Sequence, residues 1–247
     1  MTESIRVTQE AGTVSIFLNR PERRNALSLA LLARLSDALS SEVEEDTTAV
    51  IISGSGGTFS AGADLADLTG TVEDLQMDDA IEKVTRSILD LPVPVIAAVD
   101  GPCMGGAVDL ALSCDHRIAS QDAIFQVPAA RLGLLYNPAA VVRMRKRIGR
   151  DAVVRILILG ERLDATAALQ AGIVSSVVED ASYLAAMELA RLCAGNIRLS
   201  VASTKRLLNS IDNDDYDPAE WEERRLESLS SPERRVRVEA VKKRHGY

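Results

Sequence analysis

Short apolar runs alternate with longer amphipathic stretches over most of the chain. The apolar runs are rich in Val, Ile and Ala and have the length of buried strands. They predict strands over residues 5–9, 13–18, 49–52, 93–99, 116–119, 123–125 and 173–178. In the longer stretches apolar residues recur every three to four positions, which predicts helices over residues 28–39, 78–91, 107–113, 138–149, 164–170 and 183–193. Strands that alternate with helices are typical of an α/β fold.

After about residue 195 the pattern contains helices only. Asn/Asp-rich and Pro breaks separate predicted helices over residues 199–210, 218–230 and 232–243. We therefore predict a core unit over residues 1–195 and a C-terminal helical region over residues 196–247. The density of Arg, Lys and Glu in this region is typical of a solvated surface, and packing against a partner helix is the alternative.

Composition excludes several classes of protein. The net charge of −8 and the aromatic content of 3% argue against nucleic-acid binding, which needs a positive footprint and often stacking platforms. No apolar run reaches the length of about 18 residues that a membrane span needs. Three widely spaced cysteines without a CxxC motif and an N-terminus without signal-peptide features predict reduced thiols and a cytoplasmic location. Neither of the two histidines lies in a metal-binding motif, so no metal site is predicted.

Two segments share one design, in which an apolar strand leads through a Gly-containing loop into a helix. The first loop, residues 59–65, reads FSAGADL, and the second, residues 100–107, reads DGPCMGGA. Glycine lets a backbone approach a ligand closely, and the N–H groups at a helix N-terminus are unpaired and partly positive. Two such loops facing one pocket would stabilise an oxygen that gains negative charge during a reaction. Spacing alone leaves ordinary strand–helix turns as the alternative.

Asp109 is the candidate acid or base. It lies three residues after Gly106 on a predicted apolar helix, so one helical turn places it on the same face as Gly106. A carboxylate among apolar neighbours is costly to bury, which favours a functional role. A structural Asp in a cap or a salt bridge is the alternative.

Three motifs together resemble the enoyl-CoA hydratase/isomerase, or crotonase, family. They are NRPERRNAL at residues 19–27, FSAGADL at residues 59–65 and the segment over residues 101–115. They stand in family order, and the resemblance extends over nearly the whole chain. It implies a spiral core of ββα units and an acyl-coenzyme A thioester substrate of fatty acid metabolism. It also implies C-terminal helices that assemble a homotrimer or a dimer of trimers, and no cofactor apart from the CoA of the substrate.

The resemblance also implies roles for individual residues. The backbone amides of Ala63 and Gly106 would form the oxyanion hole for the thioester carbonyl. Arg24 matches the basic position near the CoA phosphates. The positions whose backbone would hold the adenine and pantetheine parts are Ala26, Ala61, Asp64 and Leu65. Lys242 and Lys243 lie near a tail position from which a basic residue reaches CoA in a neighbouring subunit.

The chain departs from the family pattern at its carboxylates. Asp109 stands where the hydratases have a glutamate, and Ala129 stands where they have a second one. Asn137 matches the aspartate of some isomerases and dehalogenases, and Tyr136 beside it either assists or simply packs. We place Ala129 and Asn137 among the residues that contact the substrate. We predict intact carbonyl polarisation, impaired two-glutamate hydration, and an enzyme with Asp109 as its single acid/base; a catalytically silent acyl-CoA binding protein is the alternative.

Overall fold

The computed structural model describes residues 3–245 and has two sheets. The larger sheet contains six strands, in the order β1 (Ile5–Glu10), β2 (Thr13–Leu18), β3 (Ala49–Gly54), β4 (Val95–Val99), β6 (His116–Ser120) and β9 (Ser176–Val178). Its first pair is antiparallel and all the others are parallel. The smaller sheet contains β5 (Pro102–Met104), β7 (Ile124–Gln126) and β8 (Leu163–Asp164).

The chain builds the two sheets by repeating one path. From the larger sheet it crosses to the smaller one and then enters a helix, first through β4, β5 and α3 (Gly106–Ser113). It repeats this path through β6, β7 and α4 (Pro138–Val153). Each repeat adds one parallel strand to each sheet. The predicted α/β spiral of ββα units is confirmed.

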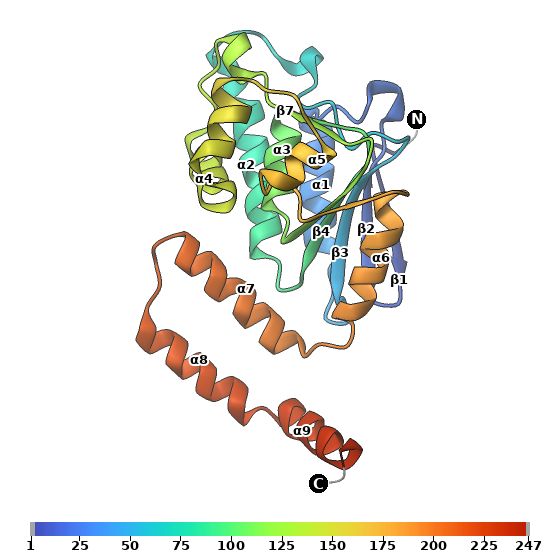
Figure 1. Ribbon diagram of the computed structural model, residues 1–247, viewed down its shortest axis with the longest axis vertical. Helices are drawn as coiled ribbons and strands as arrows, with labels where there is room; N and C mark the ends of the chain where they lie inside the picture. Colours follow the sequence, from blue (N-terminus) through green and yellow to red (C-terminus); the bar gives the residue numbers. More distant parts are fainter. Residues whose placement is uncertain (1–2, 246–247) are drawn as a thin grey trace.

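Helices cover both faces of the larger sheet (Figure 1). The remaining core helices are α1 (Leu29–Ser41), α2 (Leu75–Asp90), α5 (Ala165–Gln170) and α6 (Ser182–Cys193). In β3 the side chains of Val50 and Ile52 belong to the main core with α1, α2 and α3, whereas Ala49 and Ile51 pack with α6. This alternation explains why the strand is a continuous apolar run, because both of its faces are buried.

Short helical turns fill the connections between these elements. They are η1 (Pro21–Arg23), η2 (Leu65–Asp67), η3 (Val72–Asp74), η4 (Ala129–Leu132) and the π-helical η5 (Val154–Ile158). At Gly149, where we expected a helix end, φ is 76° and ψ is 171°, so the helix breaks. The chain then resumes a helical course to Val153, and the residue therefore marks a kink inside α4.

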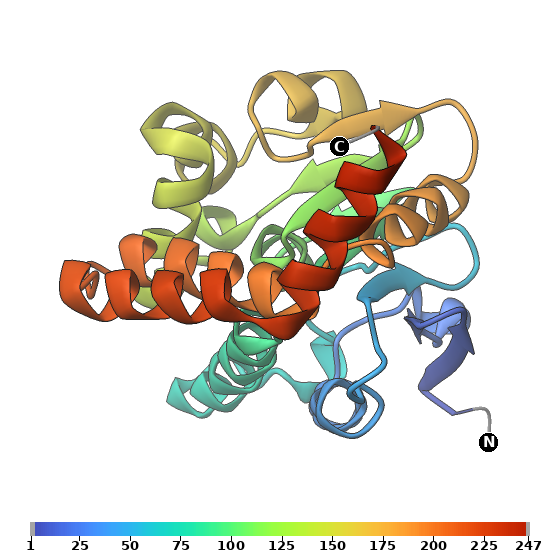
Figure 2. The ribbon, with the colours of Figure 1, turned by 90° about the horizontal axis from the view of Figure 1, so that it is seen from below.

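Three further helices form an arm that extends from the core (Figure 1), and Figure 2 views the molecule from the end at which this arm lies. They are α7 (Arg198–Asp212), α8 (Pro218–Ser230) and α9 (Pro232–Arg244). Trp221 Nε1 of α8 donates to Ser210 Oγ of α7 at 3.2 Å, and α9 buries none of its residues. Residues 1, 2, 246 and 247, at the outer ends of the two predicted units, lie outside the described residues. Within residues 3–245, no helix is long and apolar enough to cross a membrane.

Candidate active site

The two Gly-containing loops lie directly against each other. The Ser60 amide donates to Pro102 O, and the Met104 amide donates to Ser60 O, both at 3.0 Å. Gly62 has a φ of 87°, and a Cβ on it would lie 2.7 Å from Met104 O. This position therefore needs glycine both for its backbone conformation and for the close approach of the second loop.

The Ala63 amide faces away from the segment that precedes α1. Leu27 pairs with Ala63 in a parallel bridge, in which the Leu27 amide donates to Gly62 O at 2.8 Å and the Asp64 amide donates to Leu27 O at 2.9 Å. Successive peptide groups of an extended segment point in opposite directions, so the Ala63 N–H points to the other side. Among residues 3–245 this N–H has no hydrogen-bond acceptor.

The Gly106 amide is the first N–H of α3. Gly105 precedes it as the N-cap, with a φ of 54° and a ψ of −127°, which only glycine adopts readily. The first N–H groups of a helix lack an intrahelical acceptor, and in the described chain the Gly106 N–H finds no other one. The contacts between the loops therefore place the two unpaired amides, of Ala63 and Gly106, on adjoining segments; their convergence on one point stays a prediction.

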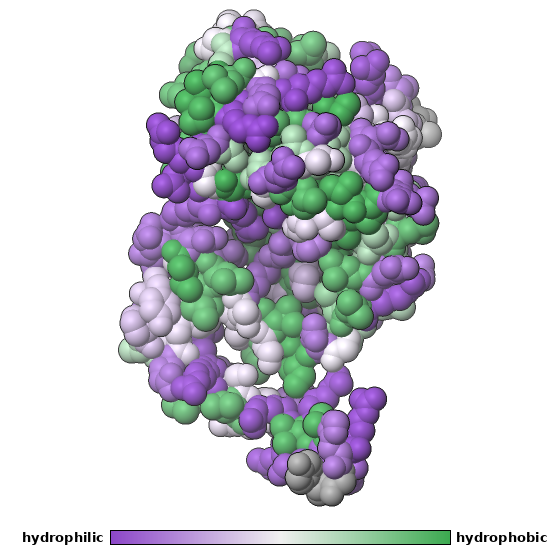
Figure 3. All heavy atoms as spheres, in the orientation of Figure 1, coloured by the Kyte–Doolittle hydropathy of each residue, from purple (hydrophilic) through white to green (hydrophobic). Residues whose placement is uncertain are grey.

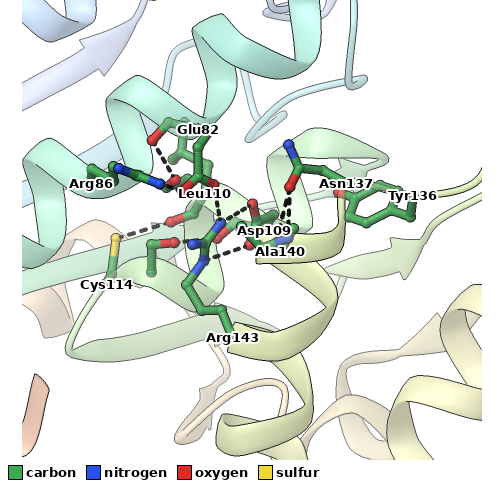
Figure 4. Close-up of polar contacts among 12 residues, drawn as sticks. Glu82, Arg86, Asp109, Leu110, Cys114, Tyr136, Asn137, Ala140 and Arg143 are labelled. Atoms are coloured by element: carbon green, nitrogen blue, oxygen red, sulfur yellow. Dashed lines mark hydrogen bonds and ion pairs between the residues drawn. The ribbon is translucent and has the colours of Figure 1, made fainter. Parts of the chain in front are cut away.

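Asp109 is buried and fully engaged by an arginine from α4 (Figure 4). Its carboxylate is 2% exposed and accepts from Arg143 Nε at 3.0 Å and from Arg143 Nη2 at 2.7 Å. Arg143 Nη2 also contacts Glu82 Oε2 of α2 at 3.0 Å. Glu82 in turn pairs with the exposed Arg86. Asp109 is thus salt-bridged, which was the structural alternative in the sequence analysis. Whether Asp109 also transfers protons stays a prediction.

Burial and ion pairing act against each other in this cluster. Burial raises the pKa of Asp109 above its ordinary value, although Arg143 opposes the rise. For Glu82, burial is outweighed by hydrogen bonds from Arg86 and Arg143, and its pKa is lowered. Burial also disfavours the charge of Arg143, but the two carboxylates overcome it and raise its pKa. The three groups are therefore one charge cluster with Arg143 at its centre.

The sequence did not reveal Arg143 and Glu82 as members of the site. Each lies on an amphipathic helix with an ordinary charged pattern, and they are 61 residues apart. The only signal in the sequence for a basic partner was Asp109 itself, because a carboxylate expected to be buried needs one.

The predicted CoA-binding segment over residues 19–27 is held in place by hydrogen bonds of the Asn25 side chain. This residue is fully buried; its Oδ1 accepts from the Arg20 amide at 2.9 Å and its Nδ2 donates to Thr58 O at 2.6 Å. Arg24 and Asn25 both have positive φ, of 51° and 54°. Arg24 is exposed, and its carbonyl accepts from the Ala61 amide at 2.9 Å. The structure therefore places Arg24 and Ala61 side by side at the surface.

Arg20 joins the segment over residues 19–27 to the first Gly-containing loop. Its Nη1 donates to Ala26 O at 3.0 Å and to Asp64 Oδ2 at 2.9 Å. Burial disfavours the charge of Asp64, but the Ala66 amide and Arg20 outweigh it and lower the pKa of this carboxyl. Leu65 is 78% exposed. What the first Gly-containing loop offers to a ligand is accordingly backbone and the apolar side chain of Leu65, because the Asp64 carboxylate is already bonded within the chain.

The remaining predicted site residues lie on the far side of the second loop. Ala129 is 5% exposed at the start of η4. Asn137 caps α4, since its Oδ1 accepts from the amides of Ala139 at 2.9 Å and Ala140 at 3.3 Å. Tyr136 points back to the second loop, where its hydroxyl donates to Gly105 O at 3.3 Å. Contacts of Ala129 and Asn137 with a substrate stay a prediction.

A hollow of about 870 Å³ lies elsewhere, beneath α7. Its wall includes Asp115, Arg117 and Lys205 and none of the residues of the two loops. In the part of the chain that is described, no group of three or more His, Cys, Asp or Glu side chains is arranged to hold a metal ion.

Comparisons with known proteins identify the family of this chain. The family model for enoyl-CoA hydratase/isomerase matches residues 8–236. The protein named "Probable enoyl-CoA hydratase echA6" of Mycobacterium leprae is 34% identical over 211 residues, which cover 83% of this chain and 82% of the relative. The mitochondrial Delta(3,5)-Delta(2,4)-dienoyl-CoA isomerase of Homo sapiens is 35% identical over 231 residues, covering 85% and 70%.

Solved structures give the same result. The crystal structure of an enoyl-CoA hydratase/isomerase family protein from Hyphomonas neptunium superimposes with a TM-score of 0.93 at 30% identity, covering 99% of this chain and 96% of that one. DspI of Pseudomonas aeruginosa gives a TM-score of 0.90 at 28% identity, covering 98% and 95%. With the fold, the matched family model and these relatives in agreement, the chain belongs to the enoyl-CoA hydratase/isomerase, or crotonase, family of enzymes.

Proposed function

We propose that this protein binds an acyl-CoA thioester and stabilises its enolate between the amides of Ala63 and Gly106. The observation that supports this most is the pair of unpaired N–H groups on two loops in direct contact. When a proton leaves the carbon next to the thioester carbonyl, negative charge moves to the carbonyl oxygen. Preorganised backbone donors stabilise that charge without having to reorient.

Asp109 serves as the single acid/base in this proposal. To accept a proton, its carboxylate releases one of its two hydrogen bonds from Arg143. Glu82 remains on Arg143, so the guanidinium keeps a counter-charge while Asp109 is neutral. The raised pKa of Asp109 favours proton uptake, because it makes the carboxylate a stronger base toward the α proton.

One carboxylate is suited to moving a proton along an acyl chain. Asp109 would take a proton from the α carbon of a 3-enoyl thioester, and the electron pair would delocalise over the γ carbon and the carbonyl oxygen. Return of the same proton to the γ carbon gives the 2-enoyl thioester. Addition of water by two glutamates is disfavoured, because Ala129 has no proton to give. The reaction moves protons only, so CoA enters as part of the substrate and no separate cofactor takes part.

We also propose that the arm assembles a homotrimer, alone or as a dimer of trimers. The helices α8 and α9 expose apolar side chains that the single chain leaves uncovered, namely Leu226, Leu229, Val236, Val238 and Val241. In the space-filling view this arm has apolar surface between charged side chains (Figure 3). Copies of the same chain would bury these residues and could bring Lys242 or Lys243 toward a neighbour's CoA.

A catalytically silent acyl-CoA binding protein is the second candidate. The observation that favours it is the bidentate pair, because Arg143 occupies both oxygens of Asp109. Asn137 likewise uses its side-chain oxygen to cap α4. In this case the loops would bind the thioester, and no group would exchange protons with it.

Turnover assays distinguish the two candidates. The protein is incubated with crotonyl-CoA and with longer 2-enoyl- and 3-enoyl-CoAs, while thioester absorbance and product mass are followed. Loss of about 100-fold or more in turnover on Asp109→Asn, with CoA binding retained, supports the enzyme. The exposed Asp122→Asn is the matched control and should remain active. Binding without turnover supports the silent protein, and absence of acyl-CoA binding contradicts both.

A further inference from the structure

The peptide group between Gly105 and Gly106 has a fixed internal geometry. No cis peptide bond occurs in the described residues, so its C=O and N–H point in opposite directions. Whatever fixes the Gly105 carbonyl therefore also fixes the direction of the Gly106 N–H. This peptide needs such an anchor, because the positive φ of Gly105 belongs to a residue with wide conformational freedom.

Two donors fix that carbonyl. The Val108 amide donates to it at 3.0 Å from within the first turn of α3. The second donor is the Tyr136 hydroxyl, at 3.3 Å, and Tyr136 lies 31 residues further along the chain. The tyrosine thus joins the η4–α4 connection to the oxyanion loop, and its partly buried ring packs on the main core.

A hydrogen bond to a carbonyl also strengthens the N–H of the same peptide as a donor. The polarisation of one end is transmitted through the amide, and in a site of low dielectric the effect is larger than in water. The Tyr136 hydroxyl is bonded to the Gly105 carbonyl, so its effect on catalysis would act through the backbone of Gly106.

We propose that Tyr136 is a positioning residue, whose hydroxyl aims and polarises the Gly106 N–H toward the thioester oxygen. This rests on the proposed oxyanion hole and adds to it a side chain that tunes one of its two donors. An aromatic residue that only packs would retain its function as phenylalanine, whereas a positioning hydroxyl would not.

The test uses Tyr136→Phe, which keeps the ring and removes only the donor. We expect turnover of 3-enoyl-CoA to fall about 2- to 12-fold, which corresponds to one lost hydrogen bond. The dissociation constant of CoA itself, which has no thioester carbonyl, should be unchanged. Tyr183→Phe is the matched control, because Tyr183 lies on α6 and its hydroxyl contacts Ser15 at 3.1 Å, outside the site.

A spectroscopic measurement keeps the test independent of turnover. Isotope-edited infrared spectra report the carbonyl stretch of a bound, ¹³C-labelled acyl-CoA thioester, which shifts to lower frequency when the carbonyl is polarised. We expect the shift to be smaller in Tyr136→Phe than in the wild-type protein and in Tyr183→Phe. An equal shift in all three proteins overturns the role of Tyr136. No shift even in the wild-type protein contradicts the oxyanion hole, so the two proposals fail in distinguishable ways.

Discussion

At the scale of single residues, Arg143 is the centre of the site's charge. It joins a carboxylate of α3 to a carboxylate of α2, and all three side chains are largely removed from solvent. A buried ion pair is costly to form but even more costly to break, because removing one partner leaves an uncompensated charge. Replacing Arg143 should therefore destabilise this part of the core far more than replacing an exposed arginine.

We expect Arg143→Leu to lower the free energy of unfolding by about 3–5 kcal/mol, because Asp109 and Glu82 lose their shared partner. Urea denaturation followed by circular dichroism measures this change. Arg86→Leu is the control, since Arg86 also pairs with Glu82 but its side chain is 70% exposed, and it should cost less than about 1 kcal/mol. Equal effects of the two substitutions would contradict a buried charge cluster.

A pH dependence follows from Asp64. Its pKa is lowered in the folded protein, so it binds fewer protons than in the unfolded chain, where the pKa is about 3.9. Its contribution is fully present above that value and is lost as the pH falls through the lower, folded pKa. Asp64→Asn should therefore lower the free energy of unfolding by about 1–2 kcal/mol at pH 6 and by progressively less below pH 4, measured by urea titrations. A difference that does not vary with pH would contradict this assignment.

At the scale of elements, the site depends on how closely two loops approach. The glycines at positions 62 and 105 allow positive φ and let the first loop rest on the backbone of the second. The loops themselves are fixed by β3 and β4, which are neighbouring parallel strands whose carboxyl ends lie together. Neighbouring strands therefore bring together the first loop, which leads into the short turn η2 rather than the predicted helix, and the second loop, which leads into α3.

We expect Gly62→Ala to lower the free energy of unfolding by about 3 kcal/mol, because a Cβ there meets Met104 O in addition to the dihedral strain. It should also lower turnover, since the two amides are forced apart. Gly70→Ala is the control: its φ of 73° is similar but nothing lies within 4 Å of the added Cβ, so only about 1 kcal/mol is expected. Thermal unfolding and turnover of both variants check this, and equal losses would show that the loops do not constrain each other.

At the scale of the whole molecule, Lys205 attaches the arm to the core. It is 7% exposed, and its Nζ donates to Ile88 O, Val93 O and Asp115 Oδ2 at 3.0, 3.1 and 2.7 Å. Asn209, one turn later, donates to Leu89 O at 2.8 Å. Beyond α7 the arm extends away from the core, as Figure 1 shows.

Lys205→Met should lower the free energy of unfolding by about 2–4 kcal/mol and expose the 194–197 connection to protease, because Asp115 and two carbonyls lose their donor. Limited proteolysis with mass spectrometry identifies the cut. The exposed neighbour Arg206 is the control, and Arg206→Met should change stability by less than about 0.5 kcal/mol. If both variants are cut at the same rate as the wild-type protein, Lys205 does not secure the arm.

The sequence alone determined the α/β class, nearly every long helix, the two Gly-containing loops and the family. These features are local: periodicity, glycine positions and motif order are all written along the chain. It also showed that, of the three positions at which the family carries catalytic carboxylates, position 109 has one and positions 129 and 137 have none. The division at about residue 195, the assembly and the cytoplasmic location stay predictions.

Only the tertiary structure decided what surrounds each of these residues. It paired Arg143 with both Asp109 and Glu82 and directed the Tyr136 hydroxyl to Gly105. These contacts join segments of the chain that lie up to 61 residues apart, and no periodicity records them. The physical reason is that a buried charge or donor must find a partner, but which one it finds depends on how whole helices pack.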